Sequence, residues 1–259
     1  MALIWLGLTL ALPLAVLFEH GLREGVVRFW AEITNPIALG AVRLTIFAAA
    51  VMTLINAVMG TLTAYTLVRY KFFGSRLLNS LIDLPFAIPT LVTGVMLVLL
   101  YGPQRTFGAW LEARGAQVIF ARPGIVLALL FITYPFVVRT VQPVLMEIDR
   151  EQEEAAWTLG ASRWRAFSKV ILPMITPAII SGALLSFARA LGEFGSIVVV
   201  AGNIPRSTLT APVYIFGQIE SQNQLGASAV SILLLTLSFA LMALVDWLER
   251  KRRGNHVAG

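Results

Sequence analysis

The chain has 259 residues, of which 58% are apolar and only 13% are charged, and its mean hydropathy is +0.80. A soluble domain needs a polar surface, so these values exclude one and predict an integral membrane protein. Cysteine is absent, which excludes disulfides, thiolate catalysis and cysteine-based metal sites. The net charge of +6 does not indicate a nucleic-acid partner, because the basic residues are spread over connections that face membrane lipid.

Six apolar runs are long enough to cross a hydrocarbon core, which requires about 20 helical residues. The first and shortest run lacks the basic start and the cleavage site of a signal peptide, so it is interpreted as an uncleaved span. The sequence therefore predicts an all-α integral membrane protein with a single domain, residues 1–259. Its six transmembrane helices are expected near residues 2–18, 44–68, 84–101, 123–145, 174–200 and 225–248.

The distribution of Lys and Arg over the connections predicts the orientation, since cytoplasmic connections are enriched in these residues. With both termini in the cytoplasm, the inner segments hold eleven basic residues: Arg69, Lys71, Arg76, Arg150, Arg163, Arg165, Lys169, Arg250, Lys251, Arg252 and Arg253. The outer segments then hold six: Arg23, Arg28, Arg105, Arg114, Arg122 and Arg206. The first span alone favours the reverse orientation, but the later connections outweigh it. Residues 147–173 are thus predicted to be cytoplasmic.

These residues, about 147–173, form a charged island between apolar runs. Acidic residues up to Glu154 suit the first turns of a helix, and basic residues follow Gly160. Ala155, Ala156 and Gly160 are small, so a partner can approach the backbone closely. Gly160 can also adopt the left-handed conformation that ends one helix and turns the chain into the next. The island is therefore predicted to be a helix-turn-helix, flat on the membrane surface, where a soluble partner docks.

The spacing of this island resembles the EAA loop of ABC importer permeases. It consists of Glu154-Ala155-Ala156, three residues, Gly160, nine residues, and then Val170-Ile171-Leu172-Pro173. Val170 stands where the family usually has Ile. The resemblance implies that Glu154, Ala155, Ala156, Gly160, Leu172 and Pro173 couple the chain to a cytoplasmic ATPase, within a type I ABC importer permease fold. The alternative is an ordinary amphipathic loop in which these small residues occur by chance.

Two ionisable residues lie inside the predicted fifth span, where each costs about 2.5–3.5 kcal/mol unless it is paired or faces water. Arg189 and Glu193 are four residues apart, so they share a helix face and can form an ion pair. Gly192 and Gly195 weaken the helix around them, and broken helices at membrane depth usually line a cavity or are buried in protein. These four residues are predicted to belong to the transport pathway or its gate. A structural ion pair is the equally weighted alternative.

The run from Ala188 to Gly195, followed by Ala201-Gly202-Asn203-Ile204-Pro205, resembles permeases that import oxyanions. Residues 83–89 and 135–143 also resemble the corresponding stretches of these permeases. Together with residues 56–60 and the predicted six spans, they resemble most the T-type permease of sulfate/thiosulfate importers. Permeases for molybdate/tungstate share much of this pattern and remain the alternative.

The resemblance implies a division of labour among several subunits. The expected partners are a second permease of the related W-type or an identical copy, two cytoplasmic ATPase subunits and an extracytoplasmic sulfate-binding protein. The chain itself contains no Gly-x-x-x-x-Gly-Lys-[Ser/Thr] loop, so ATP and Mg²⁺ are expected on the ATPase subunits and no cofactor on this chain. No catalytic motif is found, and the isolated His20 and His256 predict no metal site. The resemblance also implies a location in a bacterial-type inner membrane. The rival class is a stand-alone secondary transporter or channel, in which residues 147–173 are only a connector.

Two charges near the inner ends of spans receive structural interpretations. Asp83 is predicted to be a solvated or paired interfacial charge close to Arg76. Arg139 is expected either to extend its guanidinium to the interface or to meet the coupling loop.

Overall fold

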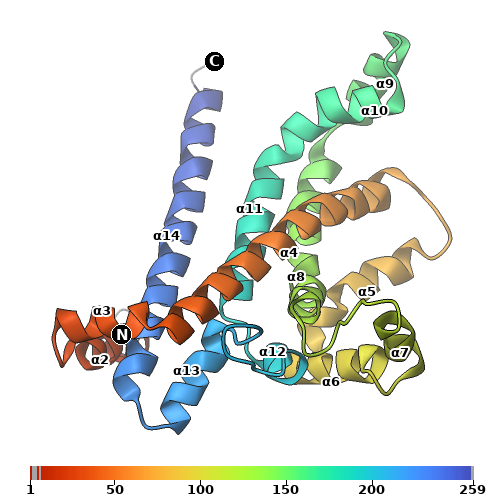
Figure 1. The fold of residues 1–259 in the computed structure, drawn as a ribbon. Helices are drawn as coiled ribbons and strands as arrows, with labels where there is room; N and C mark the ends of the chain where they lie inside the picture. The colour runs from red at the N-terminus through yellow and green to blue at the C-terminus, as the bar shows by residue number, and fades with distance from the viewer. Residues whose placement is uncertain (2–4, 6, 258–259) are drawn as a thin grey trace.

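The computed structural model describes residues 1, 5 and 7–257, and no strand occurs among them. Figure 1 shows an open bundle of helices that cross at large angles rather than a parallel bundle. The elements are η1 (Gly7–Ala11, a π-helix), α2 (Leu12–Leu22), α3 (Val26–Thr34), α4 (Pro36–Arg69), α5 (Ser75–Ala87), α6 (Thr90–Tyr101), α7 (Thr106–Glu112), α8 (Arg122–Glu147), α9 (Arg150–Thr158), α10 (Arg163–Ala166), η2 (Phe167–Ile171, a π-helix), α11 (Leu172–Leu191), α12 (Gly195–Val200), α13 (Ala211–Glu220) and α14 (Gln224–Val257).

Four helical segments of the described chain are long and apolar enough to cross a membrane, and a fifth crossing results if α5 and α6 count as one broken span. The four are residues 36–69, 122–147, 163–191 and 224–244. The predicted spans at 44–68, 123–145 and 225–248 correspond to three of them. The predicted first span corresponds in part to the shorter apolar helix Gly7–Leu22, while residues 2–4 and 6 lie outside the described residues. The all-helical class is confirmed, but the count of six spans is not.

The predicted span 84–101 is not one helix. The chain bends by 113° between α5 and α6. Ile88 precedes Pro89, and a residue before proline is pushed out of the helical region; its φ and ψ are −87° and 126°. Pro89 then stands at the N-cap of α6, where its missing N–H costs nothing. The dipeptide thus forces the break, and the first residues assigned to the span belong to the end of α5.

The predicted span 174–200 also has different limits. Its helix begins at Arg163, because α10 and η2 continue into α11 without a break, and it ends at Leu191. Gly192 caps α11 in a non-helical conformation, and the chain restarts as α12 three residues later. The predicted weakening of this helix by glycine is therefore confirmed, and it is strong enough to end the helix.

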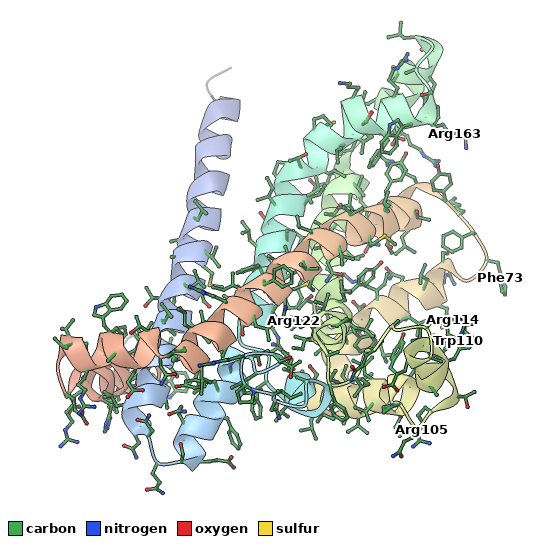
Figure 2. The ribbon with its side chains drawn as sticks, viewed as in Figure 1. Phe73, Arg105, Trp110, Arg114, Arg122 and Arg163 are labelled. Carbon is green, nitrogen blue, oxygen red and sulfur yellow. The ribbon has the colours of Figure 1, made fainter. Side chains whose placement is uncertain are left out.

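The two ends of the bundle carry different segments. In Figure 1, α9, α10 and the C-terminal end of α14 lie toward one end, whereas α13 and the start of α14 lie toward the other. The N-terminus lies beside α2 and α3, away from the α9 end. Figure 2 shows Arg163 at the α9 end and Arg105 toward the opposite end. The orientation itself stays a prediction.

The centre of the bundle is the close crossing of α4, α8 and α11. A Cβ atom on Gly60 of α4 would lie 2.9 Å from the Cβ of Val137 in α8, and one on Gly182 of α11 would lie 2.9 Å from the Val137 Cα. Small residues allow such approach in membrane proteins, where packing rather than the hydrophobic effect holds helices together. The buried Asn56 amide adds a polar link, since it donates to Thr133 Oγ1 of α8 at 2.9 Å.

We predict that Gly182→Leu destabilises the protein strongly, because the new side chain would meet the Val137 backbone, which cannot move aside locally. Overpacking of this kind typically costs about 1–3 kcal/mol. The thermal unfolding midpoint of the detergent-solubilised protein measures the effect. Gly217→Leu is the matched control, since its Cβ position has no neighbour within 4 Å. Equal midpoints for the two variants would show that the crossing does not depend on the absence of a side chain.

Candidate functional site

The main candidate site is the segment from α9 to η2, residues 150–171, which we call the coupling element. Its turn has the hydrogen bonds of a Schellman motif: Gly160 N–H donates to Trp157 O at 2.9 Å, and Ala161 N–H donates to Ala156 O at 3.0 Å. Gly160 has a φ of +82°, the left-handed conformation that the sequence predicts. Ser162 then caps α10 by accepting a hydrogen bond from Arg165 N at 3.3 Å. The element is a helix-turn-helix, as predicted.

The residues of the sequence motif fall on different surfaces of this element. Glu154 and Ala155 are exposed on α9, and Ala156 is half-buried. Gly160 is exposed, and no atom lies within 4 Å of the position that a Cβ would take there. Leu172 and Pro173 are the first two residues of α11, where Leu172 packs against the buried cluster formed by α4, α8, η2 and α11. The motif thus combines an exposed surface with an anchor in the bundle.

Large apolar side chains surround the exposed turn. The exposed fractions of Trp157, Leu159 and Trp164 are 43%, 88% and 69%. These residues lie on otherwise polar helices, among basic side chains that include the labelled Arg163 in Figure 2. Exposed aromatic and arginine side chains are enriched where proteins bind each other. This surface therefore has the character of a protein contact.

Sequence reasoning missed the residue that holds the coupling element in place. Glu153 is one of the acidic residues expected to lead into the helix, but it is only 2% exposed and pairs with the buried Arg69 of α4. Tyr65, one turn earlier on α4, donates its hydroxyl to the other carboxylate oxygen at 2.9 Å. The sequence held no local signal for this pairing, because Arg69 is 84 residues away.

The second candidate site is the break between α11 and α12. Arg189 Nη2 and Glu193 Oε2 lie 2.8 Å apart, and the exposed fractions of the two side chains are 36% and 2%. The other carboxylate oxygen, Oε1, accepts hydrogen bonds from Ser196 N and Ser196 Oγ, both at 3.0 Å. The predicted ion pair is therefore formed, and Glu193 also satisfies a free N–H group at the start of α12.

The two glycines at this break have different surroundings. A Cβ on Gly195 would collide with Thr90 Oγ1 and lie 3.0 Å from Leu91 N, so α12 packs directly on the start of α6. Gly192 has no neighbour within 4 Å of its Cβ position and borders an apolar cavity of about 470 Å³. Close packing therefore requires glycine at position 195 but not at position 192.

Arg139 does not contact the coupling element, which was one of its two expected positions. It binds Asp83 of α5 through two hydrogen bonds, Nε to Oδ1 at 2.7 Å and Nη2 to Oδ2 at 2.6 Å. Its remaining N–H groups donate to Asn79 and Gln142. Asp83 is thus a paired charge, which is one of the two interpretations made from the sequence. Its partner is Arg139. The bidentate geometry fixes α5 against α8.

A larger cavity, of about 600 Å³, lies between α4, α5, α6 and α8. Its lining consists mainly of aliphatic and aromatic side chains, such as Ile82, Met96 and Phe131. Among the described residues there is no group of three or more His, Asp or Glu side chains that could hold a metal ion.

The comparisons with known proteins agree with this architecture. Residues 56–254 match the family described as "Binding-protein-dependent transport system inner membrane component". The chain belongs to this family. Its members are permease subunits of ABC transporters, which do not themselves carry the ATPase.

Individual relatives match almost the whole length. A "Probable sulfate transport system permease protein cysT" of Nephroselmis olivacea is 43% identical, over 98% of this chain and 89% of the relative. The "Sulfate transport system permease protein CysT" of Escherichia coli K12 is 41% identical, over 100% of this chain and 93% of the relative.

Among solved structures, a chain of a bacterial alginate ABC transporter, in complex with an alginate-bound periplasmic protein, superposes with a TM-score of 0.79. It covers 96% of this chain and 91% of its own length at 18% identity, so it supports the fold alone.

We predict that Arg189→Ala depresses anion uptake and leaves assembly largely intact. A dianion in a region of low dielectric constant gains from a nearby positive charge, and the Arg189 side chain is partly exposed. Uptake of labelled anion and size-exclusion chromatography of the complex measure the two effects. Loss of the assembled complex would instead show that the pair with Glu193 is structural.

Proposed function

We propose that this chain is the sulfate/thiosulfate permease subunit of an ATP-driven, binding-protein-dependent importer. It forms the anion pathway together with a second permease and couples that pathway to two cytoplasmic ATPase subunits. The observation that carries the proposal is the coupling element: an exposed Trp157, Leu159 and Trp164 surface around the Gly160 turn, in a chain of the permease family. Glu154, Ala155 and Ala156 border this surface on α9 and provide the close approach.

The chemistry of the cavities supports a pathway between two permeases rather than within one. A sulfate dianion needs polar or positive groups around it, because desolvation of a charge in an apolar space is very costly. The cavities of about 470 and 600 Å³ are lined mainly by apolar side chains, and their lining includes neither Arg189 nor Glu193. The Arg189 side chain is 36% exposed, so it can face a second permease. The two permeases together would then form the polar route.

The resemblance to ABC importer permeases implies the following transport cycle. ATP-driven closure of the two ATPase subunits moves the coupling elements of the two permeases together, and the bundle changes from inward-facing to outward-facing. Hydrolysis then resets it. The cycle requires the coupling element on the cytoplasmic side and the binding protein at the opposite end, where α13 and the start of α14 lie (Figure 1).

The names of the relatives favour sulfate over molybdate/tungstate as the transported anion. Co-purification tests the whole assignment. The solubilised complex is expected to contain a W-type or identical permease and an ATPase, and its binding protein is expected to bind sulfate or thiosulfate in calorimetry. A binding protein selective for molybdate would reassign the substrate. Ion-driven transport without any bound ATPase would overturn the importer class.

We predict that Gly160→Val lowers ATPase binding or uncouples ATP hydrolysis from transport. A β-branched residue disfavours the φ of +82°, and its side chain enters the surface that contacts the ATPase. Co-purified ATPase and hydrolysis stimulated by loaded binding protein are the measurements.

Gly160→Asn separates the two causes, because asparagine tolerates the left-handed conformation but still adds a side chain. Recovery in the Asn variant would assign the defect to the turn, whereas equal loss would assign it to crowding in the contact. Normal coupling in the Val variant would exclude residues 150–171 as the docking element.

A further inference from the structure

The junction between α8 and the coupling element is a point where the chain direction is not fixed by helical hydrogen bonds. Ile148 and Asp149 are extended, with ψ angles of 119° and 135°, and they separate α8 from α9. The other junction differs, because α10 continues through η2 into α11 without a break. On its own, the two-residue link would let α9 swing relative to α8.

Arg69, the last residue of α4, closes this junction. Its guanidinium pairs through Nε with Glu153 Oε1 and donates through Nη2 to Ile148 O at 3.0 Å. Its backbone carbonyl, which has no partner within α4, accepts a hydrogen bond from Arg150 Nη2. One residue of α4 thus contacts the end of α8, the first residue of α9 and the buried face of α9. Arg69 and Glu153 are 9% and 2% exposed, so water screens their attraction little.

Tyr65 extends the same contact to the other arm of the coupling element. Its hydroxyl binds Glu153, and its ring packs edge-on against Phe167 of η2, with the ring centroids 4.9 Å apart. The last turns of α4 therefore hold both arms of the coupling element, although Tyr65 and Glu153 are 88 residues apart in sequence.

The opposite end of α4 contacts the far side of the bundle. Thr45 Oγ1 accepts a hydrogen bond from Ala211 N at the start of α13 at 2.8 Å, and both residues are buried. Gly40 lies against the backbone of Arg206 in the loop before α13. A single uninterrupted helix of 34 residues thus joins the coupling element to the loop that precedes α13.

We propose that the buried Glu153–Arg69 pair, with Tyr65, is the joint that passes movement of the coupling element to α4, so that α4 carries it to the opposite end of the permease. Glu153, Arg69 and Tyr65 are positioning residues for coupling. This inference rests on the proposed function, since it assumes an ATPase bound at the coupling element.

A double-mutant cycle on the assembled transporter tests the joint. Glu153→Gln, Arg69→Gln and the double variant are each purified with the ATPase, and hydrolysis is measured with and without sulfate-loaded binding protein. Each single variant is expected to retain bound ATPase and basal hydrolysis but to lose about tenfold of the stimulation, a usual size for coupling between sites. The double variant is expected to be no worse than either single variant, because each one already breaks the same contact.

Glu112→Gln is the matched control, because Glu112 of α7 is exposed and lies outside the coupling element. It is expected to couple normally. Tyr65→Phe removes only the hydroxyl that donates to Glu153. If the glutamine variants fail to assemble, this variant tests the joint in their place. Full stimulation in Tyr65→Phe, or in assembled Glu153→Gln, would overturn the joint. A wild-type complex that binds no ATPase or shows no stimulation would instead overturn the proposed function.

Discussion

The fold depends on the close contact of α4, α8 and α11 at Val137. In a hydrocarbon environment, helices gain little from hiding apolar surface, so they associate where their backbones can approach and where polar groups find partners. Gly60 and Gly182 provide that approach from two sides of α8. Asn56 adds a buried hydrogen bond to Thr133 close by. The rest of the bundle is arranged around these three helices, which pack closely because Gly60 and Gly182 have no side chains.

The charges inside this protein are placed according to the same constraint. Arg69, Arg139 and Arg189 each lie on a long helix, and each is paired with a carboxylate from a different turn or element. The three pairs differ in exposure, since Arg69 with Glu153 is almost fully buried, whereas Asp83 and Arg189 keep part of their surface open. A buried pair is costly to break, because the remaining charge stays desolvated. The pair of Arg69 with Glu153 is therefore the costliest of the three to break.

The coupling element illustrates how one segment can be both rigid and accessible. Its outer surface shows Trp157, Leu159 and Trp164, while its inner face is tied to α4 by Glu153 and to the core by Ile171. If an ATPase docks on the outer surface, as proposed, these inner contacts pass its movement to α4 and to the core. A permease of this family receives its energy from another subunit, so movement of that subunit has to become movement of the permease helices. The contacts of the coupling element with α4 and the core provide a route for this.

Much of the protein was determined by local sequence. Apolar runs of sufficient length predicted the helices that contain residues 44–68, 123–145 and 225–248, since helical hydrogen bonding within the segment is the main way to satisfy backbone groups in lipid. The spacing around Gly160 predicted the helix-turn-helix, because a left-handed turn at glycine is a local property. The Arg189 and Glu193 pair was likewise visible, because the two residues are about one turn apart.

Only the tertiary structure decided which residues meet across the bundle. Glu153 was one of several acids at the start of a predicted helix, and its partner Arg69 is 84 residues away. Arg139 likewise gave no sign of its partner Asp83, 56 residues away. The size of the bend at Pro89, 113°, could not be read from the hydropathy of the predicted span, since hydropathy measures composition and not chain direction. Pairings over such separations depend on how the helices cross, and the crossing angles are set by packing that no single segment encodes.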